Sequence, residues 1–449
     1  MKAIASMPVP QGSAGKFYPI NNCRRVRIAS SIRELLPYRR MCALLVLCYA
    51  IVVVSPAQTF TPLVSFNGTN GADPAAPLVQ GLDGNLYGTT SSGTTSAGVG
   101  TIFRTTTSGA LTTLYTFCTQ STCADGGSPT GLVQTTDRTF YGTTSYGGLS
   151  TSSGTVFKFA ADGTLTTLYR FCAQAKCADG ALPTRIIHAT DGSFYGTTNI
   201  GGANDQGTVF RVTSSGTLTT LYSFCKQSLC SDGAEPFAGV IQAKNGKFYG
   251  TTLAGGSTSK SDGTIFKITS SGTLTTLYRF CSQTNCADGA VPSAGLVQAA
   301  DGNFYGTTPS DGAHLGGTVF KITPSGVLTT LYSFCSVAKC ADGSGPGSEL
   351  IQATDGNLYG TTNGGGITNS NCTRGCGTIF KITTSGALTT LHSFCAQAHC
   401  ADGSHPNAAL LQATNGNFYG SASEGGTFYN KCGHGCGMLF KLSTGLATY

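Results

Sequence analysis

Residues 295–308 read Gly-Leu-Val-Gln-Ala-Ala-Asp-Gly-Asn-Phe-Tyr-Gly-Thr-Thr, and this stretch decides the fold because it recurs along the chain. A near-constant period of this size is the sequence signature of a repeat architecture. A second marker, a Phe after an apolar residue, recurs with it, so the chain holds seven units of about 54 residues. The Tyr-Gly dipeptides begin at Tyr87, Tyr141, Tyr195, Tyr249, Tyr305, Tyr359 and Tyr419.

Each unit reads as four short strands. In the fifth copy the runs 295–299 and 303–308 flank Asp301-Gly302, a dipeptide that favours a tight hairpin turn. Two further runs, 317–323 and 327–334, flank Ser325-Gly326 in the same way. No run after the leader shows a sustained 3.6-residue period, so we expect no helix.

Four antiparallel strands per unit, in seven copies, predict an all-β, seven-bladed β-propeller. A lone unit of about 54 residues buries too little surface to be stable by itself, so the units have to stack. Residues 60–66 match a fourth strand with nothing ahead of it, and the seventh unit ends where its own fourth strand should be. We therefore expect residues 60–66 to pair with 437–442 and close the ring, which assigns 58–449 to the propeller.

Residues 1–57 have the three parts of a signal peptide. Eight basic side chains and one acidic side chain fall within residues 1–40. The apolar run from Cys42 to Val54 is 13 residues long, too short to span a bilayer, and Ser55-Pro56-Ala57 offers small residues for cleavage after Ala57. We expect export to the periplasm or the cell exterior. The long basic region leaves the start of translation open between Met1 and a position near Met41.

Charge excludes two classes of partner. Without the leader, 19 basic and 19 acidic side chains remain, so the basic excess belongs to the export signal. No basic patch is left to bind nucleic acid or anionic membranes, and no membrane span is expected in the mature chain. With 62 Gly and 10% charged residues, the chain is typical of a turn-rich extracellular β protein, which we expect to be a monomer.

The repeat also resembles a known family. The pattern is Ala-Asp-Gly-x-x-Pro, then Gly-Leu-Val-Gln-Ala-x-Asp-Gly-Asn-Phe-Tyr-Gly-Thr-Thr, then Gly-Thr-Val-Phe-Lys-Ile-Thr-x-Ser-Gly. It is similar to the GloVer tandem repeat of bacterial "choice-of-anchor" surface proteins over about residues 60–445. The resemblance implies an exported bacterial protein and supplies no catalytic residues. No sorting tail follows the last repeat, which favours a released or periplasmic protein over an attached one.

Sixteen of the 19 cysteines fall into short local pairs, and Cys23, Cys42 and Cys48 lie in the leader. The pairs are spaced Cys-x4-Cys or Cys-x3-Cys, and neither matches the Cys-x2-Cys spacing usual in zinc sites. An even count is typical of a protein oxidised after export. We expect disulfides and no metal or other cofactor, with zinc as the alternative. The expected bridges are Cys118–Cys123, Cys172–Cys177, Cys225–Cys230, Cys281–Cys286, Cys335–Cys340, Cys372–Cys376, Cys395–Cys400 and Cys432–Cys436.

The other repeated motifs are interpreted as structural. Asp and Asn are favoured turn residues before Gly, so the Asp-Gly hairpins and the Ala-Asp-Gly after each Cys-x4-Cys pair predict turns, with calcium sites or sialidase-type Asp boxes as the alternative. The Gly-Gly runs lack the Lys-Ser/Thr that phosphate-binding loops require. Only Glu235, Glu349, Glu424, a few Asp and six His lie outside repeated turn positions, and they give no catalytic set.

Residues that break the repeat are the candidates for binding. Blades six and seven have the longest loops between their second and third strands, and these two loops alone carry the Cys-x3-Cys pairs. Binding residues concentrate on loops held by a rigid scaffold. We predict a ligand site on the face with these long loops and the Cys-stapled links between blades; drift at the closing blades is the alternative. The predicted site residues are Arg374, His399, Glu424, Lys431 and His434.

The function expected from these observations is a binding or interaction module outside the cytoplasm, with an unknown glycan or protein ligand. Two alternatives stay open, a purely structural surface protein and a glycan-cleaving enzyme on a propeller face. A pocket with two or more convergent carboxylates would favour the enzyme. A shallow rim of Tyr, Asn and Asp would favour the binding module.

Overall fold

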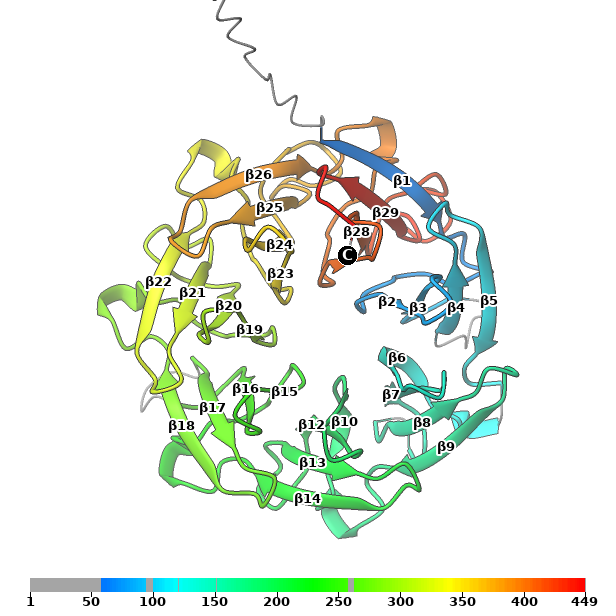
Figure 1. The fold of residues 1–449 in the computed structure, drawn as a ribbon, viewed down its shortest axis with the longest axis vertical. Helices are drawn as coiled ribbons and strands as arrows, with labels where there is room; N and C mark the ends of the chain where they lie inside the picture. Colours follow the sequence, from blue (N-terminus) through cyan, green and yellow to red (C-terminus); the bar gives the residue numbers. More distant parts are fainter. Residues whose placement is uncertain (1–57, 94–99, 120, 151, 257–261, 449) are drawn as a thin grey trace, which may run out of the picture. The chain divides into compact units, whose positions relative to one another are not determined.

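The computed structural model describes residues 58–448 except 94–99, 120, 151 and 257–261, so the predicted signal peptide lies outside the described residues. The described chain forms seven antiparallel sheets arranged around a common centre (Figure 1). Six sheets have four strands, and the third has a fifth, very short one. No helix in the described part of the chain is long and apolar enough to cross a membrane. The predicted seven-bladed propeller is confirmed.

In each blade the strands follow one another from the centre to the rim. The first four blades consist of β2 (Val79–Gln80), β3 (Leu86–Thr90), β4 (Thr101–Thr105) and β5 (Leu111–Thr116); β6 (Gly127–Gln134), β7 (Phe140–Tyr146), β8 (Thr155–Phe159) and β9 (Leu165–Arg170); β10 (Ala181–Pro183), β11 (Ile187–His188), β12 (Phe194–Ile200), β13 (Thr208–Val212) and β14 (Leu218–Ser223); and β15 (Ile241–Gln242), β16 (Phe248–Thr252), β17 (Thr264–Ile268) and β18 (Leu274–Arg279). The last three consist of β19 (Val297–Gln298), β20 (Phe304–Thr308), β21 (Thr318–Ile322) and β22 (Leu328–Ser333); β23 (Ile351–Gln352), β24 (Leu358–Thr362), β25 (Thr378–Ile382) and β26 (Leu388–Ser393); and β27 (Leu411–Gln412), β28 (Phe418–Ala422), β29 (Met438–Ser443) and β1 (Thr59–Ser65).

Two local features differ from the sequence prediction. The innermost strand of the fifth blade has two paired residues instead of the expected five, because the segment before it is held by the neighbouring blade: Thr251 Oγ1 donates to the carbonyl of Ala294 at 2.8 Å. Short 3₁₀ turns also occur where no helix was expected, each inside a Cys-stapled link. They are η1 (Ser121–Cys123), η2 (Ala175–Cys177), η3 (Ser228–Cys230), η4 (Thr284–Cys286), η5 (Ala338–Cys340) and η6 (Ala398–Cys400).

The ring is closed by the N-terminal strand, as predicted. β1 pairs antiparallel with β29, with Thr61 opposite Lys441, so the seventh blade joins both ends of the described chain. Directly after β1, Phe66 is fully buried, and its ring centroid lies 5.3 Å from that of Phe103 in the first blade. The closing strand therefore contributes both a sheet edge and a core side chain.

Neighbouring blades are held together mainly by strand two, the Phe-Tyr-Gly-Thr-Thr strand. Tyr195 stacks on Phe248 of the next blade with 4.0 Å between ring centroids. The glycine of the motif is required by packing: a Cβ at Gly306 would lie 2.6 Å from the ring of Phe320 on strand three. The hydroxyl of the first Thr of the motif donates a hydrogen bond to a backbone carbonyl of the next blade, as Thr251 does to Ala294. The hydroxyl of the second Thr is hydrogen-bonded to a Thr on strand three, as in Thr308 and Thr318, whose hydroxyls lie 2.8 Å apart.

The glutamine that ends strand one makes a further bond between blades. Gln242 Oε1 accepts the backbone N–H of Thr190 in the preceding blade at 2.9 Å, and five equivalent glutamines do the same. The third blade has His188 at this position, where the ring stacks near Phe194 with 5.0 Å between centroids. Six of the seven blade junctions therefore carry the glutamine bond, and the junction between blades two and three carries His188 instead.

A chain that starts at Gly71 should lose much of its stability, because it lacks β1 and the buried Phe66. Loss of one fully buried Phe side chain alone costs about 3–5 kcal/mol. Thermal melting of the truncated chain and of one starting at Gln58 measures the difference. Identical melting temperatures would show that the ring does not depend on β1.

His188→Gln should be neutral or slightly stabilising, because it introduces the bond that the other six junctions have. The expected gain is at most about 1 kcal/mol, the usual net contribution of one hydrogen bond. Gln242→Ala is the matched control and should lose about the same amount. Urea unfolding measures both variants, and a loss above about 2 kcal/mol for His188→Gln would contradict an equivalent role for this position.

Candidate functional site

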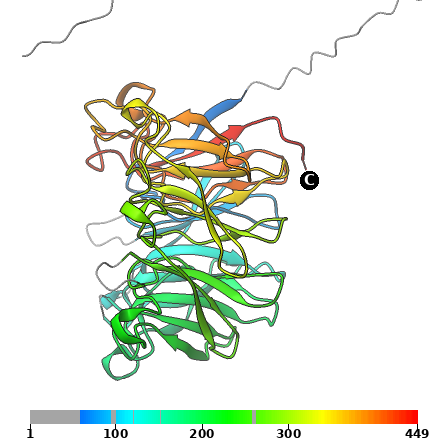
Figure 2. The same cartoon turned by 90° about the vertical axis from the view of Figure 1, so that its left-hand side faces the viewer.

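The two faces of the propeller carry different connections. The turns from strand one to strand two and from strand three to strand four are tight, whereas the loops from strand two to strand three and the links between blades are longer. Figure 2 shows the sheets edge-on, with the longer loops gathered along the left-hand edge. We call this side the long-loop face. It is the face on which the sequence predicted a ligand site.

Every stapled link on this face has the same construction. All eight predicted disulfides are present. The Asp of each Ala-Asp-Gly is buried and holds the link: Asp288 accepts the hydroxyl of Tyr278 at 2.8 Å and the backbone N–H of Gln283 at 3.2 Å. These aspartates thus do more than form the turns expected from the sequence, because each joins strand four to the link that follows it.

The Asp-Gly hairpins on the opposite face also have a second role. Asp301 Oδ2 accepts the hydroxyl of Tyr305 at 2.8 Å, and Asn245 donates to the hydroxyl of Tyr249 at 2.9 Å. These side chains are engaged within their own blade. These hydrogen bonds give the hairpin side chains a structural role within each blade.

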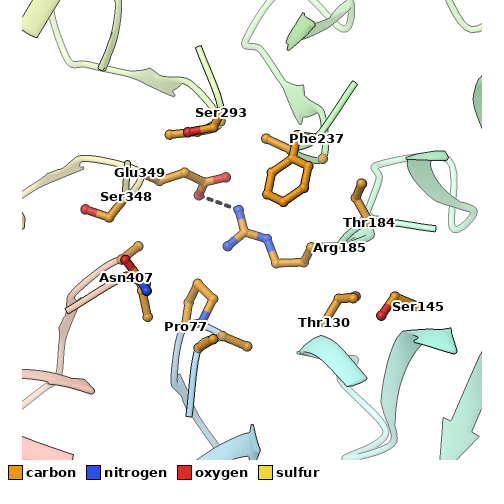
Figure 3. Close-up of a pocket in the computed structure, with 18 of the residues that line it drawn as sticks. Pro77, Thr130, Ser145, Thr184, Arg185, Phe237, Ser293, Ser348, Glu349 and Asn407 are labelled. Carbon is orange, nitrogen blue, oxygen red and sulfur yellow. Dashed lines mark hydrogen bonds and ion pairs between the residues drawn. The ribbon is translucent and has the colours of Figure 1, made fainter. Parts of the chain in front are cut away.

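A cavity of about 490 Å³ opens at the centre of the long-loop face, lined by all seven blades (Figure 3). Its wall is formed by the segments that run from each link into strand one, and most of these present small side chains such as Ala75, Ser293 and Ala408. The hydroxyls of Thr184 and Thr197 lie 2.7 Å apart, which fixes one of these segments to strand two. Parts of the wall are therefore held by hydrogen bonds within a blade, and others by bonds from a neighbouring blade, as where Thr197 Oγ1 donates to the carbonyl of Ala238 at 2.9 Å.

Among the described residues that line the cavity, Arg185 and Glu349 are the only charged ones and Phe237 is the only aromatic one. Arg185 of the third blade and Glu349 of the sixth form an ion pair inside the cavity, and the ring of Phe237 lies beside them (Figure 3). The side chains of Arg185 and Glu349 are only 23% and 18% exposed, whereas Phe237 is 58% exposed. Burial disfavours the charged guanidinium, but the Glu349 carboxylate more than offsets this and raises the pKa of Arg185. The raised pKa keeps Arg185 charged, and the exposed ring of Phe237 lies beside the pair.

Glycines at equivalent positions in neighbouring blades make room for the pair. A Cβ at Gly295 would overlap the Glu349 carboxylate, and one at Gly131 would lie 3.2 Å from Cδ of Arg185. Each blade has one residue at the position equivalent to Arg185 and Glu349. Of these seven residues only Arg185 and Glu349 carry a charge, and the others are small or Pro. These equivalent positions are Pro77, Gly131, Arg185, Gly239, Gly295, Glu349 and Ala409.

The five residues predicted from the sequence lie on the loops and link of blades six and seven. Four are exposed, and Glu424 is partly buried. Glu424 is brought close to His405, with 3.2 Å between Oε2 and Nδ1, and this contact lowers the pKa of Glu424.

Two of the other predicted residues lie near aromatic rings. The ring of His399 lies 5.8 Å from that of Tyr429, and Lys431 lies 5.4 Å from the ring of Phe428. Arg374 is exposed on the loop of the sixth blade. The five residues thus make a rim of separate contacts rather than one pocket, and nothing in these contacts tests their role in binding.

Sequence reasoning missed the cavity pair. Glu349 was noted only as an acid outside the repeated turns, and Arg185 was not singled out. The signal was available, because both stand at one repeat position that is otherwise small or Pro. What the sequence did not supply was that the third and sixth blades face each other across the centre (Figure 1).

Comparison with known proteins supports the fold. A family model described as the Gloeobacter/Verrucomicrobia repeat matches residues 50–185 and 173–373, which confirms the resemblance seen in the sequence. No curated protein matches the chain in sequence.

Two solved structures illustrate the structural similarity. A streptogramin B lyase structure is 15% identical and aligns over 86% of this chain and 97% of that chain, with a TM-score of 0.55. PorZ, a bacterial surface component of the type-IX secretion system of Porphyromonas gingivalis, is 14% identical over 86% of this chain and 48% of that chain, with a TM-score of 0.53. At such identities the similarity shows the propeller fold alone.

The stapled links predict a loss of stability at alkaline pH. Burial and the Asp288 carboxylate raise the pKa of Tyr278 to about 12, from 10.0. A group whose pKa is raised by folding stabilises the protein below its unfolded pKa and loses that effect as pH rises toward the folded value. The melting temperature should therefore fall between about pH 10 and about pH 12.

Tyr278→Phe tests this directly. It should lower stability at neutral pH, because Asp288 loses a partner, and it should make the alkaline fall shallower. Melting curves with tyrosinate absorbance across the same pH range measure both effects. An alkaline fall as steep as in the unmodified protein would contradict a contribution from this pair.

Proposed function

This chain belongs to the Gloeobacter/Verrucomicrobia repeat family, and on that premise we propose that it is an exported binding module that holds a sugar unit of a glycan. The sugar unit would lie in the cavity at the centre of the long-loop face, which we call the axial cavity. The observation that carries the proposal is the group of Arg185, Glu349 and Phe237, three departures from the repeat that meet in one cavity. Eight disulfides support maturation outside the cytoplasm, where disulfides persist.

The size and chemistry of the cavity suit a sugar unit. Its volume of about 490 Å³ lies within the range of about 300–1,000 Å³ typical of small-ligand sites. A sugar ring has an apolar face that packs on an aromatic ring, and Phe237 offers one that is largely exposed. Sugar hydroxyls both donate and accept, which matches the donors of Arg185, the acceptors of Glu349 and the amide of Asn407.

The geometry supports binding over glycan cleavage. Glycosidases generally use two carboxyl groups that flank the bond to be broken. Among the described residues that line the cavity, Glu349 is the only carboxylate, and it is paired with Arg185. A carboxylate in such a pair suits hydrogen bonding to hydroxyls better than proton donation.

A second contact area is proposed on the same face. The rim of Arg374, His399, Glu424, Lys431 and His434 has exposed cations and aromatic neighbours, which suit further units of a longer glycan or a protein ligand.

A glycan array followed by titration calorimetry tests the proposal with the protein purified after export. Phe237→Ala should weaken the best array ligand at least about tenfold, since a fully used aromatic contact contributes more than about 1.4 kcal/mol. Gly295→Ala should weaken it as well, because the new methyl group displaces the Glu349 carboxylate.

Leu82→Ala is the matched control, because Leu82 is 63% exposed and lies on the opposite face. It should change affinity less than about twofold. If Arg374→Ala and Lys431→Ala weaken binding while Phe237→Ala does not, the ligand sits on the rim instead of in the cavity. An array without any binding would overturn the assignment to glycans.

A further inference from the structure

Two disulfides face each other in the sixth blade. Cys372 and Cys376 lie in the loop between β24 and β25, and Cys395 and Cys400 lie in the stapled link after β26. All four side chains are buried, and their sulfur atoms lie within 4.8 Å of one another. This cluster was not evident from the sequence, because the two pairs lie in different segments of the chain. The Cys-x3-Cys pair is in the long loop, and the Cys-x4-Cys pair beside it is in the link of the same blade.

This grouping has the size of a tetrathiolate metal site. Four thiolates bound to Zn²⁺ at about 2.3 Å in a tetrahedron have sulfurs about 3.8 Å apart. To surround one ion, sulfurs that now lie up to 4.8 Å apart need to approach by about 1 Å, and the two sulfurs of each opened disulfide need to move apart to the same separation. The two pairs come from separate loops, as in structural zinc sites that join two segments of a chain.

The surroundings of the sulfurs suit thiolates. Asn369 Nδ2 donates to Cys395 Sγ at 3.1 Å, and Asn371 Nδ2 lies 3.6 Å from Cys400 Sγ. Hydrogen bonds from such outer groups orient and stabilise metal ligands. A zinc ion with four thiolates carries a net charge of about −2, and the basic residues Arg374 and His399 stand beside the ligands in sequence.

We propose that, once both disulfides are reduced, Cys372, Cys376, Cys395 and Cys400 bind one Zn²⁺ ion and so form a redox-dependent metal site. Two equivalents of a dithiol supply the four electrons and four protons that convert the two disulfides to four thiols, and each dithiol becomes a disulfide. Binding of Zn²⁺ by the four thiols then releases four protons. The oxidised protein keeps its eight disulfides, so the site exists only in the reduced form.

The seventh blade supplies an internal control. It has the same Cys-x3-Cys loop, with Cys432 and Cys436, but its fourth strand is β1. The link that follows β1, residues 66–73, contains no cysteine. Asn67 follows Phe66 where Cys395 follows Phe394, and a Cβ at Gly68 would stand 3.7 Å and 3.9 Å from the two sulfurs. Within the described residues, the loop of the seventh blade therefore has two cysteine sulfurs available to bind a metal ion. The sixth blade has four.

Cobalt binding tests the proposal independently of any glycan. The exported protein is reduced under anaerobic conditions and titrated with Co²⁺, which has visible absorption bands typical of tetrahedral thiolate coordination. One equivalent should bind with these bands, and Zn²⁺ should displace it. A double Cys372→Ser and Cys376→Ser variant should lose the bands, whereas the double Cys432→Ser and Cys436→Ser variant should keep them.

Two results would overturn the proposal. One is a tetrahedral thiolate spectrum that survives in the Cys372→Ser and Cys376→Ser variant. The other is its absence from the reduced unmodified protein. If the reduced protein unfolds without metal, far-ultraviolet circular dichroism after addition of Zn²⁺ provides the second measurement, and failure to refold together with absence of the bands counts against the site.

Discussion

The contact on which the propeller depends is the one that strand two makes with the next blade. Each residue of Phe-Tyr-Gly-Thr-Thr has a separate role: Phe304 receives the ring of Tyr249 from the preceding blade, Gly306 admits the ring of Phe320, and Thr307 donates to the carbonyl of Ser348 in the following blade. A blade of about 54 residues has too small a core to be stable alone. Every blade therefore relies on its two neighbours, and the ring must close for all of them to be satisfied.

This dependence explains why the fold could be predicted from the sequence and the central site could not. Seven copies of one pattern, with an unpaired strand at one end and a missing strand at the other, define the number of blades and the closure. The disulfides follow from local spacing. The pairing of Arg185 with Glu349 depends on which blades face each other across the ring, a relation between positions 164 residues apart that no local pattern contains. The cysteine cluster was missed for a similar reason, since the link and the long loop meet only in the folded blade.

The repeats also show which departures from the pattern matter for structure. The glutamine bond, the strand-two threonine bond and the Tyr–Asp bond of the link occur in most blades, so a blade that lacks one still has the others. In the seventh blade Ser421 takes the place of the first Thr, and its hydroxyl is buried without a partner in the described structure. Such a redundant set of bonds allows single positions to change without loss of the fold.

Part of the divergence of blades six and seven follows from closure itself. Phe60 of β1 stands where the other blades have Leu, and His392 of the sixth blade stands where the first five blades have Tyr. The two rings stack with 3.7 Å between centroids, while His392 Nε2 stays 3.3 Å from Asp402, the partner that Tyr has elsewhere. These replacements fit each other, so they need no ligand to explain them. Arg185 of the third blade and Glu349 of the sixth also fit each other, because they form an ion pair, whereas the largely exposed ring of Phe237 lies in the fourth blade, away from the closing strand. Closure therefore accounts for Phe60 and His392 but not for the group of Arg185, Glu349 and Phe237, and for this reason we propose that group as the ligand site.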